Sequence, residues 1–230
     1  MDGFTDENLI VPRPAKTSRD IKISWAYPNS YSIGMSGLGY QLIWWLLEQE
    51  PDVEIRRVFT DNEEPGWLNV DLLGFTLSWE LDYANILALL KKAKIPLLSS
   101  QRENDAPIIF GGGPVLTANP EPFAEFFDVV LLGDAEATIP SLVAGWRACR
   151  SLDTRAERLL FLSKIDGLYV PSLYRYVFDD PRTAIQRIEP VQDGVPDYPK
   201  KQAFAAPPDY VAHSVILSPQ GGWGDKFLLE

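Results

Sequence analysis

Short apolar runs along this chain alternate with segments in which apolar residues recur at helical spacing. Strands are predicted where the runs lie, over residues 21–27, 53–60, 71–78, 107–110 and 128–132. Helices are predicted between them, over residues 32–50, 82–92, 120–126 and 137–150. Runs such as 107–110 (PIIF) and 129–132 (VVLL) are apolar throughout, which is typical of parallel strands that are buried on both faces.

This order of elements predicts an α/β protein with a doubly wound, five-stranded parallel sheet of the flavodoxin-like kind. The predicted domain covers residues 21–150. Residues 1–20 are expected to form an irregular lead-in, because Pro12 and Pro14 interrupt regular structure.

Residues 151–230 differ in character, and we expect a helix, a small β-containing extension and a linker. The predicted pieces are a helix over 152–162, short strands at 174–178 and 184–190 with a hairpin turn over 179–182, a proline-rich linker over 191–210 and a last strand at 214–217.

Composition narrows the class of protein. The formal net charge is −11 and there is no long basic run, which predicts that nucleic acid is not a partner. The N-terminus has no apolar signal-peptide segment, and the longest apolar stretch, 38–47, is too short to span a bilayer. We therefore expect a cytoplasmic protein that does not interact with a membrane.

The chain has one cysteine, Cys149, and one histidine, His213. An iron–sulfur cluster needs three or four thiolates, so this chain by itself cannot hold one. A zinc site built from histidine and cysteine needs three or four such ligands, and with one of each residue the chain has too few. A catalytic triad would have to use His213, and no sequence pattern around it supports that role.

Four loops follow the carboxyl ends of predicted strands, where open parallel sheets bind ligands. They are residues 27–39, 76–80, 111–114 and 133–136. The glycines of the first loop give GxxGxG, which is not the order that binds a dinucleotide, and the chain has no Walker lysine motif. In the fourth loop, Asp134 and Glu136 either contact a ligand or favour the start of the following helix.

Three segments resemble the N-terminal region of radical SAM proteins that carry a cobalamin (B12)-binding domain. They are YPNSYSIGMSGLGYQ at 27–41, IIFGGGPVLTANPEPFAEFFDVVLLGDAEATIPSL at 108–142 and ILSPQGGWGDKFLLE at 216–230. In that family a segment similar to the last one leads into the radical SAM core, whose CxxxCxxC motif holds a 4Fe-4S cluster. This chain ends before such a motif, so the resemblance implies a fragment or a shortened relative.

Family members that bind cobalamin through a histidine carry DxHxxG in the first loop. When this motif is placed on Gly34, its aspartate falls on Asn29 and its histidine on Tyr31. The resemblance therefore implies either cobalamin held in the histidine-off manner or no cofactor. The residues that it assigns to the crevice are Asn29, Tyr31, Gly34, Thr76, Ser78, Gly111, Gly112 and Gly133.

Three hypotheses about function follow. The first is a non-catalytic, B12-binding-like domain whose partner is a radical SAM core that uses S-adenosylmethionine. The second is an interaction module that kept the fold, lost the cofactor and docks a protein partner or itself through tryptophans, with Trp44, Trp45, Trp67, Trp79 and Trp223 as candidate anchors. The third is a stand-alone enzyme that uses carboxylates, with Asp61, Glu80, Asp134 and Glu136 as candidates.

Overall fold

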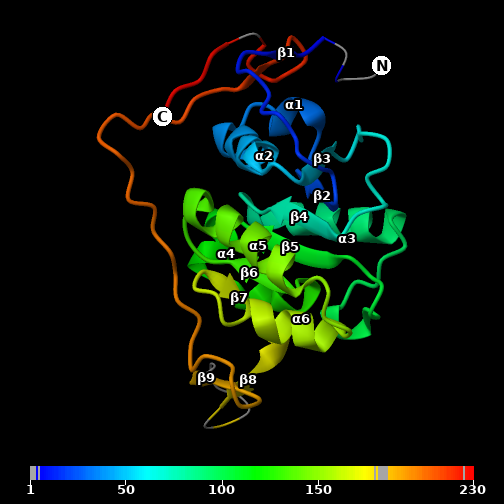
Figure 1. Ribbon diagram of the computed structural model, residues 1–230, viewed down its shortest axis with the longest axis vertical. Coiled ribbons are helices and arrows are strands. Elements are labelled where there is room, and N and C mark those ends of the chain that lie inside the picture. Colours follow the sequence, from blue (N-terminus) through cyan, green and yellow to red (C-terminus); the bar gives the residue numbers. More distant parts are fainter. Residues whose placement is uncertain (1–3, 5, 179, 181–185, 225) are drawn as a thin grey trace.

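A six-stranded sheet forms the centre of the protein in the computed structural model, which describes residues 4, 6–178, 180, 186–224 and 226–230. The strand order is β3-β2-β4-β5-β6-β7 (Figure 1). The bounds are β2 (Ile21–Ala26), β3 (Val53–Val58), β4 (Leu72–Thr76), β5 (Ile108–Gly112), β6 (Val129–Leu131) and β7 (Leu168–Tyr169). The strands β2 to β6 are parallel, which confirms the predicted α/β class and mostly parallel sheet.

The predicted count of five strands was wrong, because β7 adds a sixth strand antiparallel to β6. This strand has only two residues and lies between Gly167 and the turn that begins at Pro171, so its apolar run is too short to predict. Gly167 has a φ of +88°, and its carbonyl accepts a hydrogen bond from Leu132 N at 2.8 Å. The sheet thus continues past residue 150, where the predicted domain ended.

Alternate residues of each strand face two separate hydrophobic cores. In β2, Ile21, Ile23 and Trp25 enter the core on one face, which also contains residues of α2 (Leu38–Gln49), α5 (Ala135–Cys149) and α6 (Arg155–Leu162). In β4, Leu73 and Phe75 enter the core on the opposite face, beside residues of α3 (Tyr83–Lys92). Burial on both faces explains why the sequences of β4, β5 and β6 are almost entirely apolar.

Helices lie between β2 and β3, between β4 and β5, between β5 and β6 and after β6, whereas the described connection from β3 to β4 has no helix. Their bounds are α1 (Tyr31–Gly34), α2 (Leu38–Gln49), α3 (Tyr83–Lys92), α4 (Pro114–Ala118), α5 (Ala135–Cys149) and α6 (Arg155–Leu162). Short 3-10 turns lie at Glu80–Asp82, Ser99–Gln101, Glu121–Phe126 and Pro171–Leu173. The single helix predicted over 32–50 is divided into α1 and α2, because Gly37 has extended backbone before the start of α2.

Both ends of the chain add small β elements outside the central sheet. In the lead-in, β1 (Asn8–Leu9) pairs antiparallel with β10 (Ile216–Leu217). In the extension, β8 (Tyr174–Val177) pairs antiparallel with β9 (Arg187–Pro190). The predicted turn over 179–182 lies outside the described residues, apart from Asp180. From β9 the chain runs along the outside of the molecule back to the end where β1 and α1 lie (Figure 1).

Candidate functional site

The switch point of the sheet lies between β2 and β4, because β3 flanks β2 on its other side. Side chains join the loops at the carboxyl ends of these two strands. Asn29 donates from Nδ2 to Asp82 Oδ1 at 3.0 Å, and Asn85 donates from Nδ2 to the Pro28 carbonyl at 2.8 Å. Burial and the nearby charge of Asp82 raise the pKa of Tyr27. The first two predicted loops therefore come together in space.

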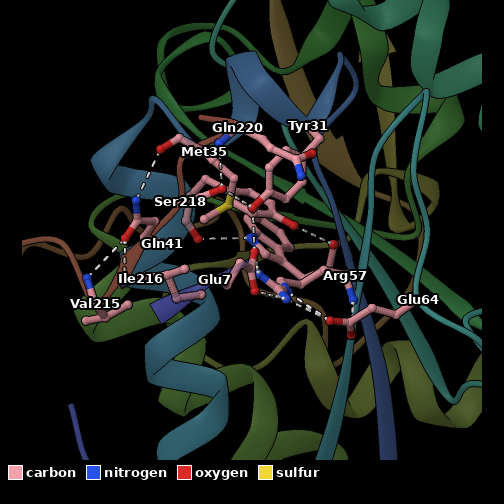
Figure 2. Close-up of polar contacts among 12 residues, drawn as sticks. Glu7, Tyr31, Met35, Gln41, Arg57, Glu64, Val215, Ile216, Ser218 and Gln220 are labelled. Carbon is pink, nitrogen blue, oxygen red and sulfur yellow. Dashed lines mark hydrogen bonds and ion pairs between the residues drawn. The ribbon is translucent and has the colours of Figure 1, made fainter. Parts of the chain in front are cut away.

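Tyr31, on which the resemblance placed the histidine of the cobalamin motif, is buried in a polar cluster. Its hydroxyl hydrogen-bonds with Glu7 Oε1 at 2.6 Å and with Ser218 Oγ at 2.8 Å (Figure 2). Burial and the hydrogen bond with Glu7 raise the pKa of the Tyr31 phenol, which keeps it protonated. The side chain thus connects the lead-in with the C-terminal segment.

Arg57 of β3 lies at the centre of this cluster. Its guanidinium contacts both Glu7 oxygens at 2.7 Å and Glu64 Oε1 at 2.8 and 3.0 Å (Figure 2). Burial acts to lower the pKa of Arg57, but the hydrogen bonds and charges of Glu7 and Glu64 outweigh it and raise the pKa. With a side chain only 4% exposed, Arg57 depends on these two carboxylates for its stabilisation.

The C-terminal segment is fixed to α1 and α2 by further hydrogen bonds. Gln41 Oε1 accepts from the backbone N–H groups of Val215 and Ile216, both at 3.0 Å, and its Nε2 donates to the Met35 carbonyl (Figure 2). Gly222 N donates to the Ser32 carbonyl, and Trp223 Nε1 donates to the Ser36 carbonyl. These hydrogen bonds hold the loop that begins at Ser218 against α1.

The glycines of the predicted crevice make room for the protein's own atoms. A Cβ at Gly111 would lie 2.5 Å from Phe127 Cε1, and one at Gly34 would lie 2.5 Å from Phe59 Cε1. At Gly133, where φ is +116°, a Cβ would lie 1.8 Å from the Gln202 carbonyl oxygen. Gln202 pairs with the backbone around this glycine, since its N–H donates to Leu132 O and its carbonyl accepts from Asp134 N.

Thr76 and Gly112 lie opposite each other in the paired strands β4 and β5. Thr76 is buried and its hydroxyl is 3.4 Å from that of Ser78, which is exposed. The predicted crevice residues are therefore divided: Asn29, Thr76, Ser78 and Gly112 lie toward the switch point, Tyr31 and Gly34 belong to α1, Gly111 packs under Phe127, and Gly133 lies under Gln202.

Large apolar side chains are exposed around the switch point. Trp79 is 60% exposed and Leu81 is 72% exposed in the turn after β4. Ile33 of α1 and Trp223 are also about half exposed, at 49% and 55%. We call these four residues the apolar rim. Among the predicted tryptophan anchors, Trp44 and Trp67 are buried in the cores, whereas Trp79 and Trp223 are exposed.

The carboxylates proposed for a stand-alone enzyme do not form one cluster, and three of them accept hydrogen bonds from different parts of the chain. Asp61 accepts from Tyr31 N at 2.7 Å, Asp134 accepts from Phe204 N at 2.8 Å, and Glu136 accepts from the Tyr210 hydroxyl at 2.9 Å. Glu80 is exposed in the turn after β4. Within the described ranges, no group of three acidic, histidine or cysteine side chains could hold a metal ion.

Glu7, Arg57, Glu64 and Ser218 were not identified from the sequence. One signal does point to Arg57: it shares a face of β3 with Val53 and Ile55, both buried, so alternation directs its charge toward the core. A buried arginine requires carboxylate partners. Their identity depends on the fold, because Glu7 and Ser218 lie far away in the sequence.

Comparisons with known proteins agree with part of the resemblance. Residues 65–171 match the model of a family described as radical SAM proteins, N-terminal. Over 204 residues, 89% of this chain, the sequence is 27% identical to an uncharacterized protein of Methanocaldococcus jannaschii. The chain spans 36% of the length of that curated relative.

No solved structure matches the chain. No helix among the described residues has the length and apolar character needed to cross a membrane. Over residues 65–171, from the turn before β4 to the turn after β7, the chain is similar to the N-terminal region of radical SAM proteins.

Proposed function

We propose that this chain is a non-catalytic N-terminal domain that docks a radical SAM core. The observation that carries the proposal is the match of residues 65–171, which include β4 to β7, to an N-terminal region of radical SAM proteins. The match to a relative that is much longer than the chain supports the presence of a further domain in such proteins. The core would bind the 4Fe-4S cluster and S-adenosylmethionine.

The apolar rim is the surface proposed for this docking. Exposed tryptophan and leucine side chains are costly to leave in water and are typical of contact surfaces between proteins. The rim lies at the carboxyl edge of the sheet, beside the switch point where α/β domains present their ligands. A core seated there would face the loops after β2 and β4.

The residues present do not fit cobalamin, which favours the alternative that the domain kept the fold and lost the cofactor. The strand order from β3 to β6 is the flavodoxin-like order, so the proposed fold is that of a cobalamin-binding domain with an added antiparallel strand. However, Tyr31 uses its hydroxyl on Glu7 and Ser218, and Phe127 fills the space at Gly111. Gln202 closes the approach to Gly133.

A cobalamin titration tests this part of the proposal. The purified protein and an equal concentration of hydroxocobalamin, at tens of micromolar, are separated on a sizing column while the visible spectrum is recorded. We expect no cobalamin absorbance in the protein peak, because the contacts described above occupy the crevice. Co-elution that is lost in Gly112→Leu, which would add a side chain to the crevice, would contradict the proposal.

The iron content of the archaeal relative tests the location of the cluster. Cys149, the lone cysteine here, is buried, and burial raises the pKa of its thiol to about 11. After anaerobic reconstitution with iron and sulfide, we expect about four iron atoms on the full-length relative. The 230-residue chain, as the matched control, should bind none. Iron on the short chain, or none on the long protein, would contradict the proposal.

A further inference from the structure

The outer edge of β3 has free backbone hydrogen-bonding groups. Ile21 N donates to Asp52 O, and Tyr27 N donates to Val58 O, so the even-numbered residues of β3 face β2. The odd-numbered residues face outward, because backbone groups alternate along a strand. Within the described ranges, neither the N–H nor the C=O of Ile55 has a hydrogen-bond partner.

Part of this edge is already covered by the chain itself. Arg57 N donates to Glu64 Oε2, and Glu64 N donates back to Arg57 O, both at 3.0 Å. Glu63 forms a bridge with Val58. The segment 62–64 therefore occupies the place of a neighbouring strand beside residues 57–59. Farther along the edge, Val53 N donates to the Glu50 carbonyl at 3.3 Å, and Ile55 has both backbone groups open.

The open part of the edge lines a cleft of about 780 Å³. One wall is the lead-in segment from Arg13 to Arg19, and Glu64 and Pro65 close one end. The lead-in is held in place by Lys16, whose Nζ donates to the Glu50 carbonyl at 3.0 Å, and by Thr17 N, which donates to the Pro51 carbonyl at 2.8 Å.

The charge of this cleft differs from that of the chain. Four cationic side chains (Arg13, Lys16, Arg19 and Arg56) and three carboxylates (Glu48, Glu54 and Glu64) line it, which gives a formal charge of +1 in a protein whose formal net charge is −11. Arg13 and Arg19 are 66% and 67% exposed, and they approach Glu48 and Glu54 only at 3.7 and 4.0 Å. Such loose, exposed pairs contribute little stability, so these guanidinium groups remain available to another anion.

A second copy of this chain does not fit the cleft. Antiparallel pairing of two β3 strands about Ile55 would place Val53 of one copy opposite Arg57 of the other. That place is already occupied by Glu64, which is bonded to Arg57. An occupant must therefore be a short extended segment that ends or turns before Glu64 and Pro65.

We propose that this cleft binds an extended acidic segment of a partner protein, which adds a strand to β3. The segment exchanges backbone hydrogen bonds with Ile55, and its carboxylates contact Arg13 and Arg19. In strand addition of this kind, main-chain hydrogen bonds provide the affinity. The proposal is independent of the docked core, because the β3 edge and the apolar rim are different surfaces.

Titration with the peptide acetyl-Glu-Val-Glu-Val-Glu-Val-amide, followed by NMR, tests the backbone contact. We expect saturable binding, with exchange of the Ile55 amide hydrogen slowed about tenfold at saturation. The Arg56 amide faces β2 and should not change. A peptide with lysine in place of glutamate should not bind, and a backbone N-methylated acidic peptide should bind about tenfold more weakly.

Two charge-reversal variants test the arginine contacts. The double variant R13E/R19E should bind the acidic peptide about tenfold more weakly. The matched control K91E/K226E has the same change in net charge, at exposed lysines that do not line the cleft, and should bind within about twofold of the parent protein. Equal weakening in the two variants, equal binding of the N-methylated peptide, or amide changes confined to other surfaces would overturn the proposal.

Discussion

Replacing Asp128 by alanine is expected to lower the free energy of unfolding by about 3–5 kcal/mol, the cost of breaking a buried ion pair. Asp128 is fully buried immediately before β6 and accepts from Arg102 Nη1 at 2.9 Å and from Arg155 Nη2 at 2.6 Å. It also accepts from Ile109 N at 2.7 Å. Burial lowers the pKa of both arginines and Asp128 opposes that shift, so its removal leaves two poorly solvated guanidinium groups.

Urea unfolding monitored by tryptophan fluorescence measures this loss. The matched control is Arg147→Ala, which breaks an arginine–carboxylate pair with Asp52 on the surface, where the arginine side chain is 40% exposed. We expect a loss of less than about 1 kcal/mol for the control, because exposed pairs contribute little. Similar losses for the two variants would show that the buried cluster does not stabilise the fold as its contacts indicate.

Replacing Arg57 by methionine is expected to cost about 3 kcal/mol and to loosen the lead-in. The change leaves Glu7 and Glu64 without their shared cation, while methionine retains much of the apolar packing against Phe4 and Trp44. Because Glu7 fixes the lead-in beside β1, its release should make residues 6–12 sensitive to protease under native conditions.

Unfolding in urea and limited proteolysis with mass spectrometry measure these two effects. Arg56→Met is the control at the neighbouring position, because Arg56 contacts Glu54 nearer the surface and should cost less than about 1 kcal/mol. If Arg57→Met leaves both the unfolding midpoint and the cleavage pattern unchanged, the polar cluster does not hold the lead-in.

The apolar runs were sufficient to predict β4, β5 and β6, because those strands are fully buried. The edge strand β3, VEIRRV, was predicted although three of its six residues are charged. β7 was missed since two residues carry no periodic signal. The prediction of a single helix over 32–50 was wrong at Gly37. The helical spacing of apolar residues continues through this position, but the backbone there is extended and separates α1 from α2.

The candidate site was predicted less well than the fold. Glycines in four loops indicated a ligand crevice, but Gly34 and Gly111 accommodate the rings of Phe59 and Phe127. A sequence does not show whether the space beside a glycine is filled by a ligand or by another part of the chain. The contact between Gly133 and Gln202 joins segments 69 residues apart, and only the folded structure reveals it.

Hydrogen–deuterium exchange in the full-length archaeal relative tests the docking surface directly. Exchange is compared between that protein and a truncation to the 204-residue region that matches this chain. We predict that the segment aligned with Trp79 and Leu81 exchanges at least about tenfold more slowly in the full-length protein, because the core covers the apolar rim. Equal exchange of this segment in the two proteins would contradict the proposed docking of a radical SAM core.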